Sequence, residues 1–523
     1  GPPYSWTVVV PSAARGTYRV ELGDACRTVD VAEAADDPPH AKHSYGPTWR
    51  ATRAWDRSTE ELYSAWIEQL FDAPLDQALA WPALHEVLRD PKRNALHDYL
   101  GEGEDEAGEH AVVVQPDCAD LPYFLRAYFS YKLGLPFGYS SCTRGDGGQA
   151  PRCSKWHSNL DPNRSRRRDR AQAFGEFLRV TLADVVHSGT GRTLAEDDRT
   201  DYYPVPLSLE SLRPGTVYAD PYGHVLIVVK RIAGTRDAGG VLLAVDGQPD
   251  GTVSRRRFWR GNFLFADDRA MGSPGFKRFR PVVADGGRER ALTNAEIEAR
   301  ADYGDYSLDQ YKGGVEGFYD AMDDVLSPVP LDPTVALLET IDTFEEQVKG
   351  RVLSVSNGQK YLAKGGDEID MPDGPSIFET TGPWEDFSTP SRDLRLLIAI
   401  DVVTGFPARV ARRPARFAMP AGKTPADVKA ELEARLEAEL AKRKFTYTRS
   451  DGSPFELTLA DVVERARSLE MAYNPNDCVE VRWGAPPRSD EAKTCRRRAP
   501  GSQTAHMRRY RAWFHERKRP PRS

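Results

Sequence analysis

The 523-residue chain has only six cysteines and six methionines, and it lacks a long apolar run. Because a transmembrane helix needs about 20 consecutive apolar residues, the sequence predicts a protein without a membrane span. Neither a C-x-x-C pair nor an H-E-x-x-H motif occurs, so we expect no metal site. A glycine loop of the kind that holds phosphates is also missing, and we expect no cofactor.

The chain also lacks the excess of positive charge that is typical of nucleic-acid-binding proteins. Its net charge is −7, and its 40% hydrophobic and 28% charged residues are ordinary for a soluble globular protein. A chain of this length exceeds a single core and predicts roughly two to four domains. We therefore expect a multidomain protein, and nucleic acid is not an expected partner.

Four of the six cysteines form two local pairs. Cys142 and Cys153 enclose a glycine-rich loop, and Cys478 and Cys495 enclose a second polar loop. Cysteines close together in polar loops are typical of disulfides in exported proteins. We predict both disulfides, and a secreted, periplasmic or cell-envelope protein whose signal peptide has been removed. The alternative is a cytosolic protein in which all six cysteines are reduced and buried.

Cys118, one of the two cysteines left over, lies at a predicted helix start. Asp117 precedes it as a capping residue, and apolar residues follow at helical spacing from Leu121. The partial positive charge of a helix N-terminus stabilises a thiolate, which is the nucleophilic form of cysteine. Cys118 is therefore a candidate nucleophile. The alternative is a small buried hydrophobic residue.

His224 is the candidate base for this thiol. A thiol nucleophile needs a group that takes its proton and returns it to the leaving group. The segment Gly223–Val229 places His224 at the start of a strongly apolar strand, where the ring would be held on a rigid sheet. The alternative is a hydrogen-bonded core histidine without a catalytic role.

Polar residues at the end of the next predicted strand, 240–248, complete the candidate site. If the two strands are antiparallel neighbours, Asp246 lies beside His224 and can orient its ring. Gln248 is a second candidate for this role. Gln115, just upstream of the cysteine, is a candidate donor to an oxyanion.

These segments resemble the papain-like cysteine hydrolases, in particular the NlpC-type cell-wall endopeptidases. In that family an Asp-Cys pair opens a helix, and a Leu-x-Pro-Gly turn precedes a strand with Gly-His-Val. Asp117-Cys118, Leu212–Thr216 and Gly223–Val225 match in the same order. The resemblance covers roughly residues 105–265, less than a third of the chain.

The resemblance implies a papain-like α+β core, in which a helix carrying Cys118 packs on an antiparallel sheet carrying His224 and Asp246. It implies hydrolysis of peptide or isopeptide amides in a peptide or cell-wall polymer such as peptidoglycan. Two features depart from the family: Ala119-Asp120 replaces the usual Ser-Gly, and the spacing from cysteine to histidine is long. Two alternatives stay open, namely a transglutaminase-like acyl transferase and a non-catalytic cell-wall-binding or scaffold protein that retains the fold.

Composition and periodicity divide the chain into five regions. We expect a small β segment at 1–35, a helical lobe at 46–104, a catalytic domain at 105–275 with an insertion at 138–200, a mixed α/β accessory region at 280–475, and a disulfide loop with a basic tail at 476–523.

Local patterns give further expectations in these regions. A capping box that begins at Ser58 predicts a helix start, and Leu394–Ile400 predicts a buried strand. Thr424 and Pro425 begin a long helix. From Arg496 the chain carries ten Lys or Arg and one acidic residue. This tail could contact an anionic surface, or it could be a helix packed back onto an acidic domain.

Overall fold

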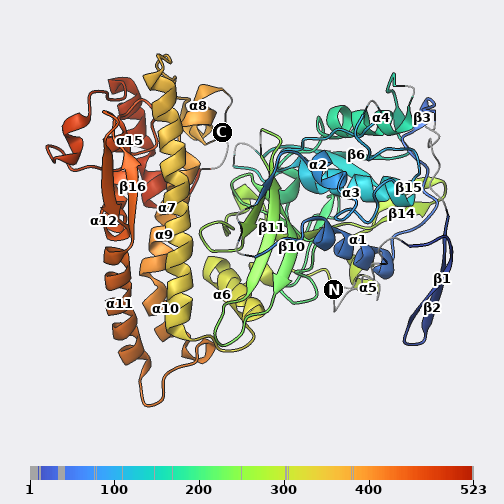
Figure 1. The fold of residues 1–523 in the computed structure, drawn as a ribbon, viewed down its shortest axis with the longest axis horizontal. Helices are drawn as coiled ribbons and strands as arrows, with labels where there is room; N and C mark the ends of the chain where they lie inside the picture. The colour runs from blue at the N-terminus through green and yellow to red at the C-terminus, as the bar shows by residue number, and fades with distance from the viewer. Residues whose placement is uncertain are drawn as a thin grey trace.

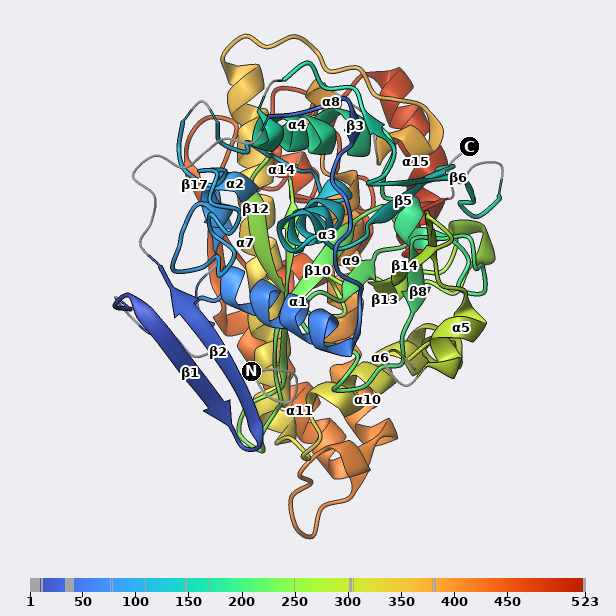
Figure 2. The same cartoon turned by 90° about the vertical axis from the view of Figure 1, so that its right-hand side faces the viewer.

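Two units lie side by side in the structure, which is a computed structural model (Figure 1). The N-terminal α/β unit spans residues 42–326, and the C-terminal helical unit spans residues 333–520. A hairpin of β1 (Gly16–Leu22) and β2 (Ala25–Val31) stands at the outer edge of the α/β unit (Figure 2). The structure describes residues 10–520 apart from 11–12, 33–41, 76, 78, 109, 146–147, 168, 249, 301–302, 304, 379 and 381.

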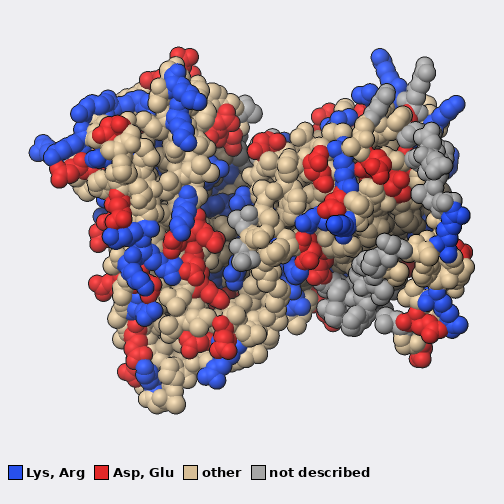
Figure 3. All heavy atoms as spheres, in the orientation of Figure 1, with Lys and Arg blue, Asp and Glu red and all other residues tan. Residues whose placement is uncertain are grey.

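Ion pairs join α6 (Gly314–Leu326) of the α/β unit to α10 (Phe406–Arg412) and the residue after it in the helical unit. Arg412 and Arg413 both contact Asp320, at 2.7 and 3.2 Å. Figure 3 shows the two units in contact, with a hollow between them on the upper side of that view. A single exposed ion pair stabilises little, whereas a shared network restricts how the two units can move.

Seven antiparallel strands form the central sheet of the α/β unit, in the order β4-β12-β11-β10-β9-β13-β8. Along the chain they are β4 (Ala80–Trp81), β8 (Tyr202–Pro204), β9 (Val217–Ala219), β10 (Val225–Ile232), β11 (Val241–Gly247), β12 (Val253–Arg257) and β13 (Gly275–Phe279). This antiparallel sheet with surrounding helices confirms the predicted α+β class. The papain-like arrangement of the core remains a prediction.

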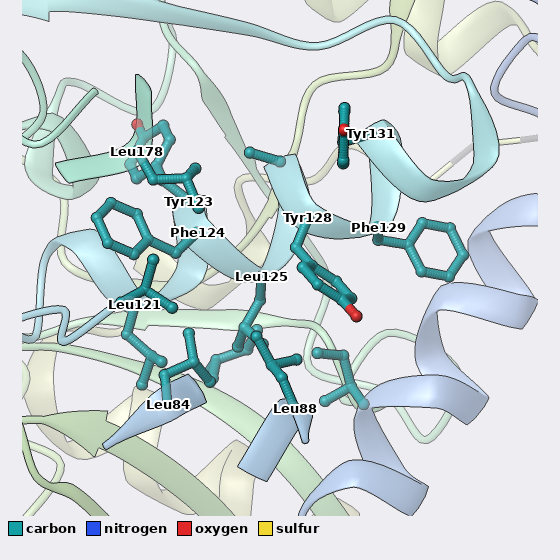
Figure 4. Close-up of a cluster of buried hydrophobic side chains, with 14 of the residues drawn as sticks. Leu84, Leu88, Leu121, Tyr123, Phe124, Leu125, Tyr128, Phe129, Tyr131 and Leu178 are labelled. Atoms are coloured by element: carbon teal, nitrogen blue, oxygen red, sulfur yellow. The ribbon is translucent and has the colours of Figure 1, made fainter. Parts of the chain in front are cut away.

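An aromatic core lies between this sheet and three helices, α1 (Arg57–Leu70), α2 (Leu84–Leu88) and α3 (Asp120–Leu133). Every α3 residue after the first is buried. The rings of Trp66 and Tyr128 stack with their centroids 5.7 Å apart. Figure 4 shows side chains of α3 pointing toward α2 and α1. Because each large apolar side chain contributes roughly 1.5–3 kcal/mol on burial, this core holds α3 firmly in place.

Strand β10 is buried on both faces, which explains its uninterrupted apolar sequence. Val225, Ile227 and Val229 belong to the core that contains α1 and α3. Leu226 and Val228 belong to a second core on the opposite face, which includes α6. Since successive side chains of a strand point to opposite faces, residues at both kinds of position are apolar. The strand that begins next to His224 is therefore rigid.

Lys132 of α3 is fully buried and is surrounded by carboxylates. Its ammonium group donates to Asp105 at 2.5 Å and also to Glu104, and these three side chains are at most 2% exposed. A buried charge without a partner would cost several kcal/mol. The two acids therefore neutralise Lys132, and these ion pairs join the loop that contains them to α3.

The remaining elements of the α/β unit are small and lie before α1, in the region predicted as an insertion, and after the central sheet. They are β3 (Gly46–Pro47), β5 (Gly138–Cys142), β6 (Cys153–Ser158), β7 (Pro162–Asn163), α4 (Arg170–Glu176), the π-helix Phe177–Leu182, β14 (Val282–Asp285), β15 (Arg288–Ala291) and α5 (Asn294–Ala299). The predicted Cys142–Cys153 and Cys478–Cys495 disulfides both form. Two disulfides are compatible with a secreted protein.

The helical unit packs around one core with a small hairpin. Besides α10 its elements are α7 (Pro333–Ala363), α8 (Pro383–Phe387), α9 (Pro390–Thr404), α11 (Pro425–Lys442), β16 (Lys444–Thr448), β17 (Pro454–Thr458), α12 (Leu459–Glu464), α13 (Ala466–Leu469), α14 (Val479–Arg482) and α15 (Gly501–His515). Among the described residues, no helix has the length and apolar character needed to cross a bilayer.

The predicted strand at Leu394–Ile400 is wrong, because these residues lie within α9. This helix is buried on several sides, so its sequence shows a continuous apolar run instead of a helical stripe. The basic C-terminal segment forms α15, with Met507 and Phe514 buried in the core. The sequence left two alternatives for this segment, an anionic-surface contact and a packed helix, and in the structure it is a packed helix. Contact with an anionic surface remains a prediction.

Candidate active site

Cys118 lies just before α3 and has a free, partly buried thiol. The Asp117 carboxylate accepts hydrogen bonds from the N–H groups of Ala119 and Asp120, at 2.8 and 2.9 Å. The regular helix begins at Asp120 with Ala119 as its N-cap, so Asp117 is not the cap that the sequence predicts. Its carboxylate instead binds the turn that leads into the helix. The N-terminus of α3 therefore points its positive end toward the segment that carries the thiol.

His224 lies in the tight loop 220–224 between β9 and β10. The Asp220 N–H donates to the His224 carbonyl at 2.7 Å and closes this loop. Gly223 has a φ of 93°, a conformation that favours glycine. Its carbonyl oxygen lies 3.9 Å from the Cys118 sulfur, within reach of the thiol. Two segments far apart in the sequence are thus brought together, as the sequence predicts.

Asp246 contacts the His224 ring through its Nε2 nitrogen. Nε2 of His224 lies 2.5 Å from Oδ2 of Asp246, and the Asp246 side chain is only 1% exposed. The register of the strands explains this contact. Ile227 pairs with Val245 in this antiparallel pair, so Asp246, one residue further along β11, lies closer to His224. The contact leaves Nδ1 as the ring nitrogen available to the thiol.

The environment favours the charged forms of His224 and Asp246. Burial alone would lower the pKa of His224, but the charge of Cys118 and hydrogen bonds with Asp246 and Cys118 raise it from 6.5 to about 10. Burial would raise the pKa of Asp246, but the hydrogen bond and charge of His224, with the charge of Arg256, hold it below its usual value. At neutral pH the site therefore favours a protonated His224 ring beside the Asp246 carboxylate.

Gly247 allows the end of β11 to approach the segment before the cysteine. A Cβ atom at this position would lie 2.4 Å from the Asp117 carbonyl oxygen, too close for any other residue without a backbone shift. The contact fixes the spacing between the strand that carries Asp246 and the nucleophile. The sequence contains the signal, since glycine inside a strand often marks a close backbone approach, but it does not identify the partner.

The two glutamines predicted as oxyanion or orienting residues lie near the site. Gln115 is exposed, and a Cβ atom on Gly251 would lie 2.8 Å from its Cβ. Nε2 of Gln248 is buried, and the Gln248 amide lies near enough to Asp246 to help lower the pKa of that carboxyl group. Their roles in catalysis stay predictions.

Two charged residues of the site were missed by the sequence reasoning. Burial, followed by the nearby charge of Asp117, raises the pKa of Asp120 to about 8. Its carboxyl group is therefore largely neutral at pH 7, two residues after the nucleophile. Arg256 places Nε 3.5 Å from Asp246. Neither effect follows from the sequence, because the burial of Asp120 and the approach of Arg256 to Asp246 both depend on tertiary packing.

Neither a metal site among the described residues nor a similar known protein gives further information about the site. Within the described ranges, the one cluster of potential metal ligands is Cys478, Glu480 and Cys495, and its two sulfur atoms are joined in a disulfide. No protein-family model matches the chain, and neither a curated protein nor a solved structure matches it. The function must therefore be argued from the site itself.

Proposed function

We propose that the protein is an exported cysteine hydrolase that cleaves peptide or isopeptide amide bonds. The observation that carries this proposal is the chain of contacts from Cys118 through the His224 loop to the buried Asp246. A thiol at a helix start, an imidazole beside it and a carboxylate that orients the ring are the three groups that nucleophilic catalysis requires. The two disulfides support the exported location.

The reaction follows from these roles. His224 takes the thiol proton of Cys118 through Nδ1, and the thiolate attacks the carbonyl carbon of the scissile amide. The tetrahedral intermediate collapses when the imidazolium gives its proton to the leaving amine, which leaves a thioester on Cys118. Water, deprotonated by His224, then attacks the thioester and releases the acid and the thiol. Asp246 keeps the ring oriented throughout and stabilises its charged form.

The resemblance to NlpC-type endopeptidases directs the choice of substrate. We propose peptide stems of peptidoglycan as the substrate class, with the amide and isopeptide bonds of those stems as the cleaved bonds. Gln115 and Asp117, just before the nucleophile, are exposed, and Cys118 itself is partly exposed.

A mass-spectrometric assay on defined stem peptides and cross-linked stem dimers tests this function. The wild-type protein should release amine and acid fragments, whereas Cys118→Ala and His224→Ala should release none and Asp246→Asn should be slower. Cys26→Ala changes the other free cysteine and should behave as wild type. Activity that survives in Cys118→Ala would contradict the proposal. With excess lysine in the assay, a lysine-bearing product would identify acyl transfer instead of hydrolysis.

A further inference from the structure

The loop that carries His224 is also held by the C-terminal helical unit. Asp220, at the start of the loop, is fully buried, and Nη2 of Arg395 in α9 donates to its Oδ2 at 2.9 Å. Nη1 of the same arginine donates to the carbonyl oxygen of Asn262 at 2.6 Å. Arg395 therefore connects α9 to two separate turns of the α/β unit.

Arg519, near the C-terminus, makes a second contact with the loop. Its guanidinium donates to the carbonyl oxygen of Tyr222 and lies over the Phe378 ring, 5.1 Å from the centroid. Only 6% of Arg519 is exposed. The Tyr222 ring packs against the hydrophobic core of the helical unit. The helical unit thus contacts the loop through a salt bridge, a hydrogen bond and an apolar surface.

Hydrogen bonds inside the loop connect these contacts with the two reacting groups. The Asp220 carboxylate that binds Arg395 also accepts from the Tyr222 N–H at 2.7 Å. The Asp220 backbone donates to the His224 carbonyl at 2.7 Å and accepts from the Gly223 N–H at 3.2 Å. A displacement of Asp220 would therefore move both the imidazole and the carbonyl oxygen that faces the thiol.

We propose that Arg395 and Arg519 are positioning residues, through which the helical unit holds His224 in register with Cys118. The site is then complete only when the two units are docked. The inference rests on the proposed function, in which these two groups react together. A misplacement of about 1 Å in such a pair can cost about 100-fold in rate. The helical unit would thereby control a site to which it contributes no reacting group.

The test measures the second-order rate of Cys118 alkylation by iodoacetamide from pH 5 to 10 in the full-length protein. Arg395→Ala should slow the reaction at least about tenfold at pH 7, and its pH profile should approach that of His224→Ala. Arg395→Lys, which keeps the charge, should recover part of the rate. Arg443→Ala is the matched control, because Arg443 contacts Asp342 and Glu345 within the helical unit and should leave the rate unchanged.

Circular dichroism and the thermal midpoint separate misplacement from unfolding. If Arg395→Ala does not fold, Arg519→Gln replaces it with the same expectation. A folded variant that reacts at the wild-type rate at every pH would overturn the positioning role. If wild-type Cys118 itself reacts no faster than Cys26, the hydrolase proposal fails. The NMR resonance of the His224 ring then decides the inference, since it should shift in Arg395→Ala and stay in place in Arg443→Ala.

Discussion

Replacing Cys118 by alanine should lower the pKa of His224 strongly. In the native site the charge of Cys118 is the largest effect that raises this pKa to about 10, and burial opposes it. Two unit charges about 4 Å apart, at an effective dielectric constant of about 20, attract by about 4 kcal/mol. This energy equals about 3 pKa units. The pKa of His224 should therefore fall to about 7 in Cys118→Ala.

NMR of protein labelled with ¹³C at the histidine ring measures this change. The resonance of His224 is assigned by its loss in His224→Gln, and its shift is followed from pH 5 to 11. Cys26→Ala removes the other free thiol, on the distant β1–β2 hairpin, and should leave the titration unchanged. An ordinary His224 pKa near 6.5 that is the same with and without Cys118 would refute the proposed ion pair.

The pKa of His224 also predicts how this pair affects stability. Because its folded pKa of about 10 lies above the ordinary value of 6.5, the protonated form is favoured by folding. The resulting stabilisation is complete below about pH 6.5 and is lost as the pH rises through 10. In Cys118→Ala most of this pH dependence should disappear, so the thermal midpoints of the two proteins should converge above pH 10.

Three further substitutions test the surroundings of the site. Lys132→Met removes the countercharge of two buried carboxylates and should lower the free energy of unfolding of the α/β unit by about 3–5 kcal/mol. The exposed Lys429→Met should change it by less than about 1 kcal/mol in the same denaturant titrations. Gly247→Ala should cost about 1–3 kcal/mol and slow Cys118 alkylation; a wild-type rate would contradict the close approach. Asp120→Asn should raise the thermal midpoint at pH 8.5 but not at pH 4, because folding disfavours the ionised form of a carboxyl group whose folded pKa is about 8. If the variant and the wild-type protein have the same midpoint at both pH values, burial of Asp120 does not raise its pKa.

The triad candidates could be chosen from the sequence because each follows from a local pattern. Asp117 marks a helix start, and the apolar run after His224 marks a buried strand that pairs with the strand ending in Asp246. Antiparallel pairing of sequential strands then brings His224 and Asp246 together. The local disulfides were predictable for the same reason, since each joins cysteines in one loop.

Other features could not be predicted because they depend on tertiary packing. Leu394–Ile400 is apolar on several sides since α9 is buried by several neighbours, and an apolar run of this length does not distinguish a helix from a strand. The helix predicted from Ser58 is capped instead by Asp56, whose carboxylate accepts from the Thr59 N–H. The contacts of Arg395 join residues far apart in the chain, and no local pattern indicates them.

The pH dependence of native alkylation tests the central claim most directly. The protein is treated with iodoacetamide from pH 5 to 10, and labelling is quantified by peptide mapping, with exposed Cys26 as the internal reference. The account predicts that Cys118 reacts rapidly already near pH 6, and that His224→Ala makes its rate rise with pH as that of Cys26 does. If Cys118 follows the Cys26 curve in the wild-type protein, or stays unlabelled until denaturation, the thiolate–imidazolium pair does not exist.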